Sequence, residues 1–109
     1  MNIVFMGSST FAIPSLRILR KPEYNVRAVY SQPPRKAGRG KSYKEVPLAE
    51  FAFSRGLKVE QPQTLNDPSV VANLKSYEPD FLIVVAYGLI LSKEVLKIPK
   101  EFSINVHGS

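Results

Sequence analysis

The chain has 109 residues, the length of one small domain, and its content of 44% hydrophobic and 22% charged residues is that of a folded chain rather than a disordered one. It contains no cysteine, which excludes a disulfide framework and thiolate chemistry. The net charge of +6 comes almost entirely from residues 35–44, where five basic residues and no acidic one occur, so it indicates an anion contact at one place rather than a generally polycationic surface.

Short apolar runs alternate with helix-like segments along the sequence. In chain order, the pattern predicts a strand at 2–6, a helix at 11–20, a strand at 25–31, a helix at 47–55, a strand at 57–60, a helix entered at 66–68, a strand at 80–86, a helix at 92–97 and a strand at 102–106.

The expected helices have recognisable ends and apolar faces. Ser8, Ser9 and Thr10 are plausible N-caps for the first helix, and Ser92 is expected to cap the last one. The apolar residues of the first helix should form a broad buried face made of Phe11, Ile13, Leu16, Ile18 and Leu19.

Residues 32–45 are predicted to form an exposed loop, since they contain adjacent prolines, two glycines and the five basic residues. Gly40-Lys41-Ser42 resembles the end of a phosphate-binding P-loop, but Arg35 stands where that motif requires its leading glycine. The dinucleotide-binding glycine pattern fails as well, because Ser9 occupies its second glycine position. Arginine and lysine on such a loop fit either phosphate contacts with RNA or a solvated surface, and the sequence leaves both open.

The alternation of strands and helices predicts an α/β fold with a parallel sheet, right-handed crossovers and a central strand at 80–86 that is covered on both faces. In open α/β sheets, ligands bind beyond the carboxyl ends of the strands. Asn105, His107 and Ser109 lie at one such end, and no later helix covers the final strand. The chain is therefore expected to be an incomplete domain.

Asn105 and His107 lie two residues apart, so in an extended strand their side chains should project to one side while Ile104 and Val106 face the other. An amide donor beside an imidazole can stabilise a developing oxyanion and move a proton near neutral pH. The alternative is that His107 makes only a local hydrogen bond. With one histidine and no cysteine in the chain, no metal site is expected.

Gly88 follows the predicted central strand, within the segment Tyr87-Gly88-Leu89. A glycine at the carboxyl end of a strand allows the backbone to approach a flat ligand closely, or it simply permits a turn. The sequence does not decide between these two roles.

The motifs that matter most are spread over essentially the whole chain. They are Ile3-Val4-Phe5-Met6-Gly7 with Phe11-Ala12, then Ser31-Gln32-Pro33, Arg35 with Ala37-Gly38-Arg39-Gly40-Lys41, Val84-Val85-Ala86-Tyr87-Gly88-Leu89-Ile90-Leu91, and Ile104-Asn105-Val106-His107-Gly108-Ser109. In combination they resemble the methionyl-tRNA formyltransferase family. The Asn-x-His-Gly-Ser end is shared with related formyltetrahydrofolate-using enzymes, including the purine-pathway transferase, whereas the Ala-Gly-Arg-Gly-Lys loop is more particular to the tRNA enzyme.

The resemblance implies a Rossmann-like parallel sheet with helices on both faces and a set of site residues. Asn105 and His107 match two of the family's three catalytic residues, with Asn105 binding the oxyanion and His107 handling the proton. The folate-contacting segments would contain Ser109, Val85, Tyr87, Gly88 and Leu89. The loop that grips the acceptor arm of tRNA would contain Arg35, Lys36, Arg39, Lys41 and Lys44, with Arg39 as the best single contact.

The resemblance also implies the reaction and its partners. A formyl group would move from 10-formyltetrahydrofolate to the amino group of methionyl initiator tRNA, without a metal, in a cytoplasmic and monomeric enzyme that binds neither DNA nor membranes. Two alternatives stay open: another 10-formyltetrahydrofolate-dependent formyltransferase with a purine or sugar substrate, and a non-catalytic RNA-binding module.

The chain departs from the family pattern in three ways. Ser8-Ser9-Thr10 stands where the family usually has Thr-Pro-Asp or Thr-Pro-Glu, and Pro34-Arg35-Lys36 where it commonly has Asp-Arg-Pro. Family members are roughly three times as long, with a catalytic aspartate and a C-terminal β-barrel beyond residue 109. Residues 1–109 are accordingly expected to be the N-terminal part of the catalytic domain, without useful turnover by themselves.

Overall fold

The structure is a computed structural model, and it describes residues 1–37 and 42–106. Five strands form one sheet: β1 (Asn2–Gly7), β2 (Asn25–Tyr30), β5 (Val59–Glu60), β6 (Phe81–Val85) and β7 (Phe102–Val106). Their order across the sheet is β5-β2-β1-β6-β7, and every neighbouring pair is parallel. The predicted parallel α/β fold is confirmed, and each strand lies where the apolar runs placed it.

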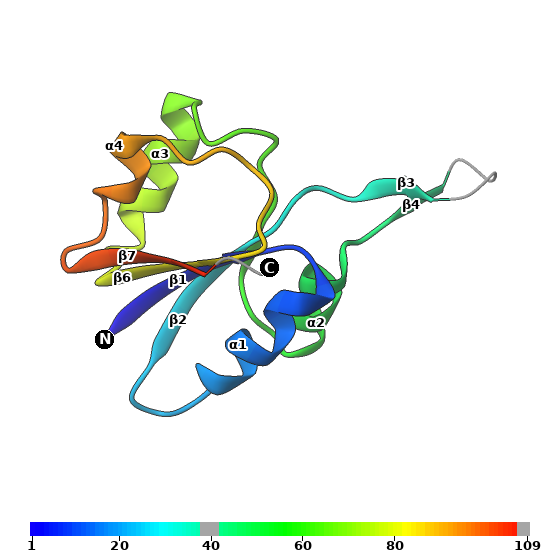
Figure 1. The fold of residues 1–109 in the computed structure, drawn as a ribbon, viewed down its shortest axis with the longest axis horizontal. Coiled ribbons are helices and arrows are strands. Elements are labelled where there is room, and N and C mark those ends of the chain that lie inside the picture. The colour runs from blue at the N-terminus through cyan, green and yellow to red at the C-terminus, as the bar shows by residue number, and fades with distance from the viewer. Residues whose placement is uncertain (38–41, 107–109) are drawn as a thin grey trace.

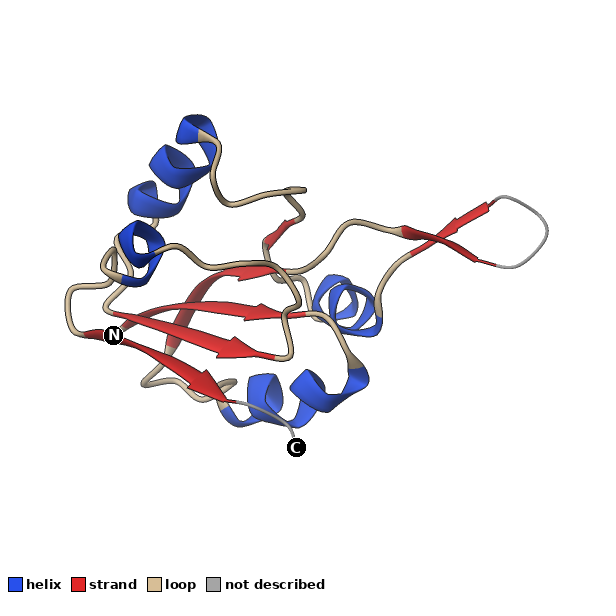
Figure 2. Cartoon of the chain, turned by 45° about the horizontal axis from the view of Figure 1, so that its top comes forward, coloured by secondary structure: helices blue, strands red, loops and turns tan. Residues whose placement is uncertain are grey.

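Four α-helices of the described part cover the two faces of this sheet (Figures 1 and 2). On one face, α1 (Ile13–Ile18) and α2 (Pro47–Ser54) pack against the side chains of Ile3 and Phe5. On the other face, α3 (Pro68–Ser76) and α4 (Lys93–Leu96) pack against Val4 and Met6. Successive side chains of β1 thus enter opposite layers of the core, which is why a central parallel strand is apolar at every position.

The first helical segment has a smaller buried apolar face than the sequence predicts. It begins as a 3₁₀ turn, η1 (Thr10–Ala12), before α1, and Pro14 occupies the first turn of α1, where no hydrogen-bonded amide is needed. Leu16 is buried, but Phe11 and Ile18 are 53% and 62% exposed. The expected broad apolar face is therefore wrong for these two residues, because the 3₁₀ turn and the shortness of α1 leave them outside the contact with the sheet.

Residues 32–45, which the sequence predicts to be an exposed loop, contain two short strands. β3 (Arg35–Ala37) and β4 (Ser42–Lys44) pair antiparallel and form an arm that projects from the body of the protein (Figure 1). The prolines and glycines of the segment indicate turns, but the cross-strand pairing is invisible to a local pattern. Arg35, Lys36 and Ser42–Lys44 are exposed, so the predicted exposure is confirmed for these residues. We call this element the basic hairpin.

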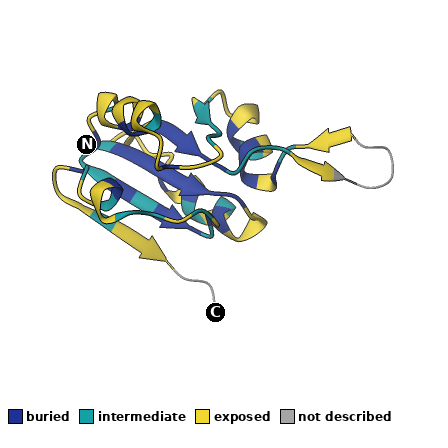
Figure 3. Ribbon diagram, turned by 90° about the horizontal axis from the view of Figure 1, so that it is seen from above, coloured by how far each residue is buried: buried dark blue, intermediate teal, exposed yellow. Residues whose placement is uncertain are grey.

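β7 forms one edge of the sheet as far as the structure describes the chain. Phe102 packs edge-to-face on Phe81 with ring centroids 4.9 Å apart. Ile104 and Val106 are exposed, and most of β7 is exposed, in contrast to the neighbouring strands (Figure 3). No helix within residues 1–37 and 42–106 is long and apolar enough to cross a membrane.

Candidate functional site

Three polar groups meet where β1, β2 and β6 end, at the carboxyl edge of the sheet. The Ser8 hydroxyl, just after β1, donates a hydrogen bond to the Tyr87 carbonyl oxygen at 2.8 Å, and it accepts one from the Gln32 amide N–H at 3.0 Å. The Gln32 side-chain Nε2 also donates to the Tyr87 carbonyl, at 2.9 Å. The segments that follow three neighbouring strands are thus tied together at the position where α/β folds bind ligands.

The chain turns sharply after β6 to bring the Tyr87 carbonyl into this position. Ala86 and Gly88 both have positive φ, at 50° and 92°, and the second value is one that residues with a side chain rarely adopt. A Cβ atom on Gly88 would lie 2.0 Å from Nε2 of Gln32. The turn, and the close approach of Gln32, therefore account for this glycine without a ligand.

An open cavity of about 440 Å³ lies over this edge. Its walls are the turn after β1, the turn at Ala86–Gly88, and the side chains of Gln32 and Arg35. The guanidinium of Arg35 is the cationic group of this wall, and its Nη2 donates a hydrogen bond to Oε1 of Gln32. The cavity can therefore receive an anionic or hydrogen-bonding group of a substrate.

The residues predicted to contact folate are placed as follows. The Val85 side chain is fully buried among core residues, and Tyr87 is 2% exposed with its hydroxyl buried, so burial raises the pKa of that hydroxyl and keeps it protonated. Leu89 is partly buried against the α3–α4 layer, and Gly88 is exposed. A ligand can therefore reach mainly the backbone of this segment. Ser109 lies outside the described residues.

Asn105 lies at the carboxyl end of β7, directly opposite Val84 of β6. It is exposed and, with Ser103, borders an open cavity of about 490 Å³ beside α4, whereas Ile104 pairs with Ile83. This side of the sheet is the one that α3 and α4 cover, because Val84 packs in their core cluster and Ser103 Oγ donates a hydrogen bond to the Leu96 carbonyl. The predicted alternation along β7 is confirmed for Asn105. His107, its expected companion, lies outside the described residues.

The basic hairpin brings three of the five predicted RNA-contacting cations together. Arg35 is paired directly opposite Lys44, and Lys36 is opposite Tyr43, all at exposed positions. Like charges placed opposite each other on a strand pair are destabilising, so a bound anion would relieve the repulsion. Arg39 and Lys41 lie outside the described residues.

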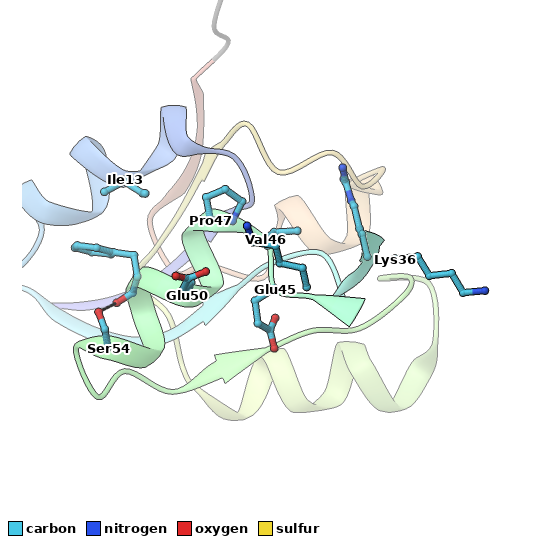
Figure 4. Close-up of a pocket in the computed structure, with 10 residues that line it drawn as sticks. Ile13, Lys36, Glu45, Val46, Pro47, Glu50 and Ser54 are labelled. Carbon is cyan, nitrogen blue, oxygen red and sulfur yellow. Dashed lines mark hydrogen bonds between the residues drawn. The ribbon is translucent and has the colours of Figure 1, made fainter. Parts of the chain in front are cut away.

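A third open cavity, of about 610 Å³, lies between the root of the hairpin and α2 (Figure 4). Its lining is mixed in charge, with Glu50 on α2, Glu45 directly after β4, and the cations Arg35, Lys36 and Lys44 of the hairpin. Lys36 extends away from α2 in Figure 4. The Lys36 ammonium is therefore available to a partner outside this cavity.

Sequence reasoning missed the two residues that organise the edge. Ser8 was expected to be a possible helix cap, but its hydroxyl bonds the Tyr87 carbonyl instead. Gln32 was part of the Ser31-Gln32-Pro33 motif, with no role predicted for its side chain. A usable signal was the position of both residues: they are polar, Ser8 directly follows β1, and Gln32 lies two residues after the end of β2. Within residues 1–37 and 42–106, no group of three or more histidine, cysteine or acidic residues is placed to hold a metal.

Comparison with known proteins identifies this architecture. A family model described as "Formyl transferase" matches residues 1–109, the whole chain. The methionyl-tRNA formyltransferase of Clostridium tetani is 52% identical over 110 residues, that of Alkaliphilus metalliredigens 48% over 109, and that of Xylella fastidiosa 49% over 109. Each alignment covers 100% of this chain and 35% of the relative, so the chain spans about a third of the length of these curated relatives. The chain belongs to the formyl transferase family and corresponds to an N-terminal part of its members.

Proposed function

We propose that this chain is the N-terminal part of the catalytic domain of an enzyme that transfers a formyl group from 10-formyltetrahydrofolate to the amino group of methionyl initiator tRNA. The observation that carries the proposal is that the basic hairpin starts at the carboxyl edge of the parallel sheet, where Arg35 lines one cavity with Ala86 and Gly88. Asn105 lies at the carboxyl end of β7 in the same sheet. The relatives at about 50% identity bear the name of that activity. Translation initiation, a cytoplasmic location and a monomeric enzyme belong to the same proposal.

The chemistry assigned to the edge is acyl transfer between two nitrogen atoms. The amine of methionyl-tRNA attacks the formyl carbon, the carbonyl electrons move onto oxygen, and the resulting tetrahedral species carries an oxyanion. The side-chain amide of Asn105 donates a hydrogen bond to this oxyanion, and such a donor is commonly worth about 100–1000-fold in rate. His107 takes the proton that the attacking amine loses and delivers it to the folate nitrogen that leaves.

The two substrates would approach the edge from different directions. The backbone of residues 85–89, together with Ser109, would contact the folate, since the side chains of Val85 and Tyr87 are turned into the core. Arg35, Lys36, Arg39, Lys41 and Lys44 would bind phosphates of the acceptor arm. Closely spaced cations on an exposed arm suit a polyanion, and the affinity should fall steeply with salt as counterions are released.

The test uses the full-length enzyme with 10-formyltetrahydrofolate and three acceptors: methionyl initiator tRNA, a purine-pathway amine and an amino sugar. We expect formylation of the tRNA alone. Two variants then separate the roles. Asn105→Ala should lower turnover about 100–1000-fold while tRNA binding survives. The double variant Lys36→Gln with Lys44→Gln should weaken tRNA binding.

Other outcomes would replace the proposal. Formylation of a small amine that is insensitive to the charge of the hairpin would identify a purine or sugar enzyme. Binding of tRNA without any formyl transfer, unaffected by Asn105→Ala, would identify an RNA-binding module.

A further inference from the structure

Gln32 is hydrogen-bonded both to the basic hairpin and to the turn after β6. Its Oε1 accepts a hydrogen bond from Nη2 of Arg35, at the start of β3. Its Nε2 donates to the carbonyl of Tyr87, 55 residues away in the sequence, at 2.9 Å. Its backbone N–H donates to Ser8 Oγ, which in turn donates to the same carbonyl. These contacts form a closed ring of hydrogen bonds with Arg35 attached to it.

The orientation of the Gln32 amide is determined by its partners. A guanidinium can only donate hydrogen bonds and a carbonyl can only accept them. The reverse orientation would place the amide oxygen against the Tyr87 carbonyl and the amide nitrogen against Arg35, and both contacts would be lost. Gln32 therefore connects a cation to a carbonyl in one direction only, and among the natural side chains of this length only glutamine can do so.

The packing at Gly88 shows how closely Gln32 lies on the turn. A Cβ atom at Gly88 would meet Nε2 of Gln32 at 2.0 Å and its Cδ at 3.3 Å. The amide group thus occupies the space above the exposed backbone of Gly88. A displacement of Gln32 changes both the hydrogen bonding of the turn and what lies over it.

We propose that Gln32 is a positioning residue that couples RNA engagement by the basic hairpin to the geometry of the Tyr87–Gly88 turn. This inference rests on the proposed function, in which the hairpin binds tRNA phosphates and the turn faces the formyl donor. Arg35 has five N–H donors, so it can hold a phosphate in a bidentate manner and keep its bond to Gln32. The phosphate then fixes the guanidinium, the guanidinium fixes the amide of Gln32, and the amide fixes the carbonyl of Tyr87.

Two variants cut this connection at different points. Gln32→Glu keeps an acceptor for Arg35 but lacks the donor for the Tyr87 carbonyl, so it removes one of the two side-chain hydrogen bonds to the turn and leaves that of Ser8. Arg35→Ala removes the guanidinium that links the hairpin to Gln32, and it leaves the side-chain amide of Gln32 free to rotate. In the full-length enzyme, Gln32→Glu should lower kcat about tenfold with little change in KM for tRNA, the loss expected for one hydrogen bond to a positioned group.

Arg35→Ala should raise KM for tRNA and also lower kcat. Because both variants break one connection, the double variant Gln32→Glu with Arg35→Ala should have a kcat close to that of Gln32→Glu alone. The matched control is Asn73→Asp, which makes the same change from an amide to a carboxylate. Asn73 Nδ2 donates to Oε2 of Glu60 at 2.9 Å, and no hydrogen bond among the described residues joins the Asn73 side chain to Gln32 or to the turn. This variant should leave kcat unchanged.

A second measurement does not depend on turnover. Amide hydrogen exchange of residues 86–89 is followed with and without uncharged initiator tRNA, in the wild-type enzyme and in Gln32→Glu. We expect tRNA to slow exchange at these amides in the wild type and to have little effect in the variant. If the wild type binds tRNA but formylates nothing, the proposed function fails while this measurement still tests the coupling.

The coupling is refuted by additive losses of kcat in the double variant, by equal kcat values for Gln32→Glu and the wild type, or by tRNA protection of residues 86–89 that persists in Gln32→Glu. Absence of tRNA binding by the wild type also overturns it.

Discussion

Gly7, the last residue of β1, is packed so tightly that a single methyl group should destabilise the fold. A Cβ atom there would lie 2.7 Å from the Val85 carbonyl oxygen, 2.8 Å from the Ala12 Cβ and 2.9 Å from a methyl group of Leu48. Ordinary contacts between such atoms are about 3.5–4.0 Å. Gly7→Ala therefore inserts a methyl group into a space that is already filled from three directions.

The size of the effect follows from which neighbours can move. The Leu48 methyl can rotate away, but the Ala12 Cβ has no rotamer to change, and the Val85 carbonyl belongs to the strand paired with β1. Overpacking a core typically costs about 1–3 kcal/mol, and two immovable neighbours place this site at the upper end, about 3 kcal/mol. For a domain of about 150–250 residues, that loss lowers the melting temperature by about 6–12 °C.

Gly56 provides the contrast, because its backbone conformation, and not its packing, favours glycine. Its φ is +72° and nothing lies within 4 Å of an added Cβ. Gly56→Ala should cost only about 1–2 kcal/mol of backbone strain, and Gly56→Asn less, since asparagine tolerates this conformation. At Gly7 the order reverses, with asparagine far worse than alanine. Urea and thermal unfolding of the four full-length variants measure this pattern. A Gly7→Ala variant within about 0.5 kcal/mol of the wild type would show that the packing argument is wrong.

Three further predictions concern the site and one helix end. Asn105→Ala should lower kcat for formyl transfer about 100–1000-fold with KM for tRNA nearly unchanged, and a loss below tenfold in steady-state assays would remove Asn105 from the oxyanion role. The double variant Lys36→Gln with Lys44→Gln should reduce the slope of log affinity against log salt by about 2 in tRNA titrations, and an unchanged slope would mean that these cations touch no phosphate. Asp67 caps α3 by accepting the Ser69 amide N–H at 2.9 Å, and this bond lowers the pKa of the carboxyl below its ordinary value of 3.8. The cap therefore stabilises the protein above that value and is lost as the pH falls through the lowered pKa, so the melting temperatures of wild type and Asp67→Asn should converge on acidification, and a constant difference would contradict the assignment.

Local signals were sufficient wherever a residue's structure depends on its near neighbours. Ser92 caps α4 as expected, with its hydroxyl accepting the Val95 amide N–H, because a cap acts within one helical turn. The strand at Phe102–Val106 has the predicted bounds, and Asn105 lies on the predicted face, because alternation along a strand is a property of consecutive residues.

The same local reasoning failed where the partner is distant in sequence. Ser8 looks like a helix cap, yet its hydroxyl bonds a carbonyl 79 residues away. Phe11 and Ile18 fit an apolar helix face, yet the position of α1 on the sheet leaves them exposed. Residues 32–45 are predicted to be a loop because they contain adjacent prolines and two glycines, yet Arg35–Ala37 and Ser42–Lys44 pair into a hairpin.

The sequence alone indicates a parallel α/β architecture, a concentration of positive charge and an Asn-x-His motif at the end of a strand, because each of these is a property of neighbouring residues. Only the tertiary structure shows which residues connect the strand ends. No local signal marks the role of Gln32 until β1, β2 and β6 bring Ser8 and Tyr87 beside it and its sequence neighbour Arg35. The reason is physical: a sheet aligns the ends of strands that are far apart in the chain, so the contacts that organise its edge do not exist until the sheet has formed.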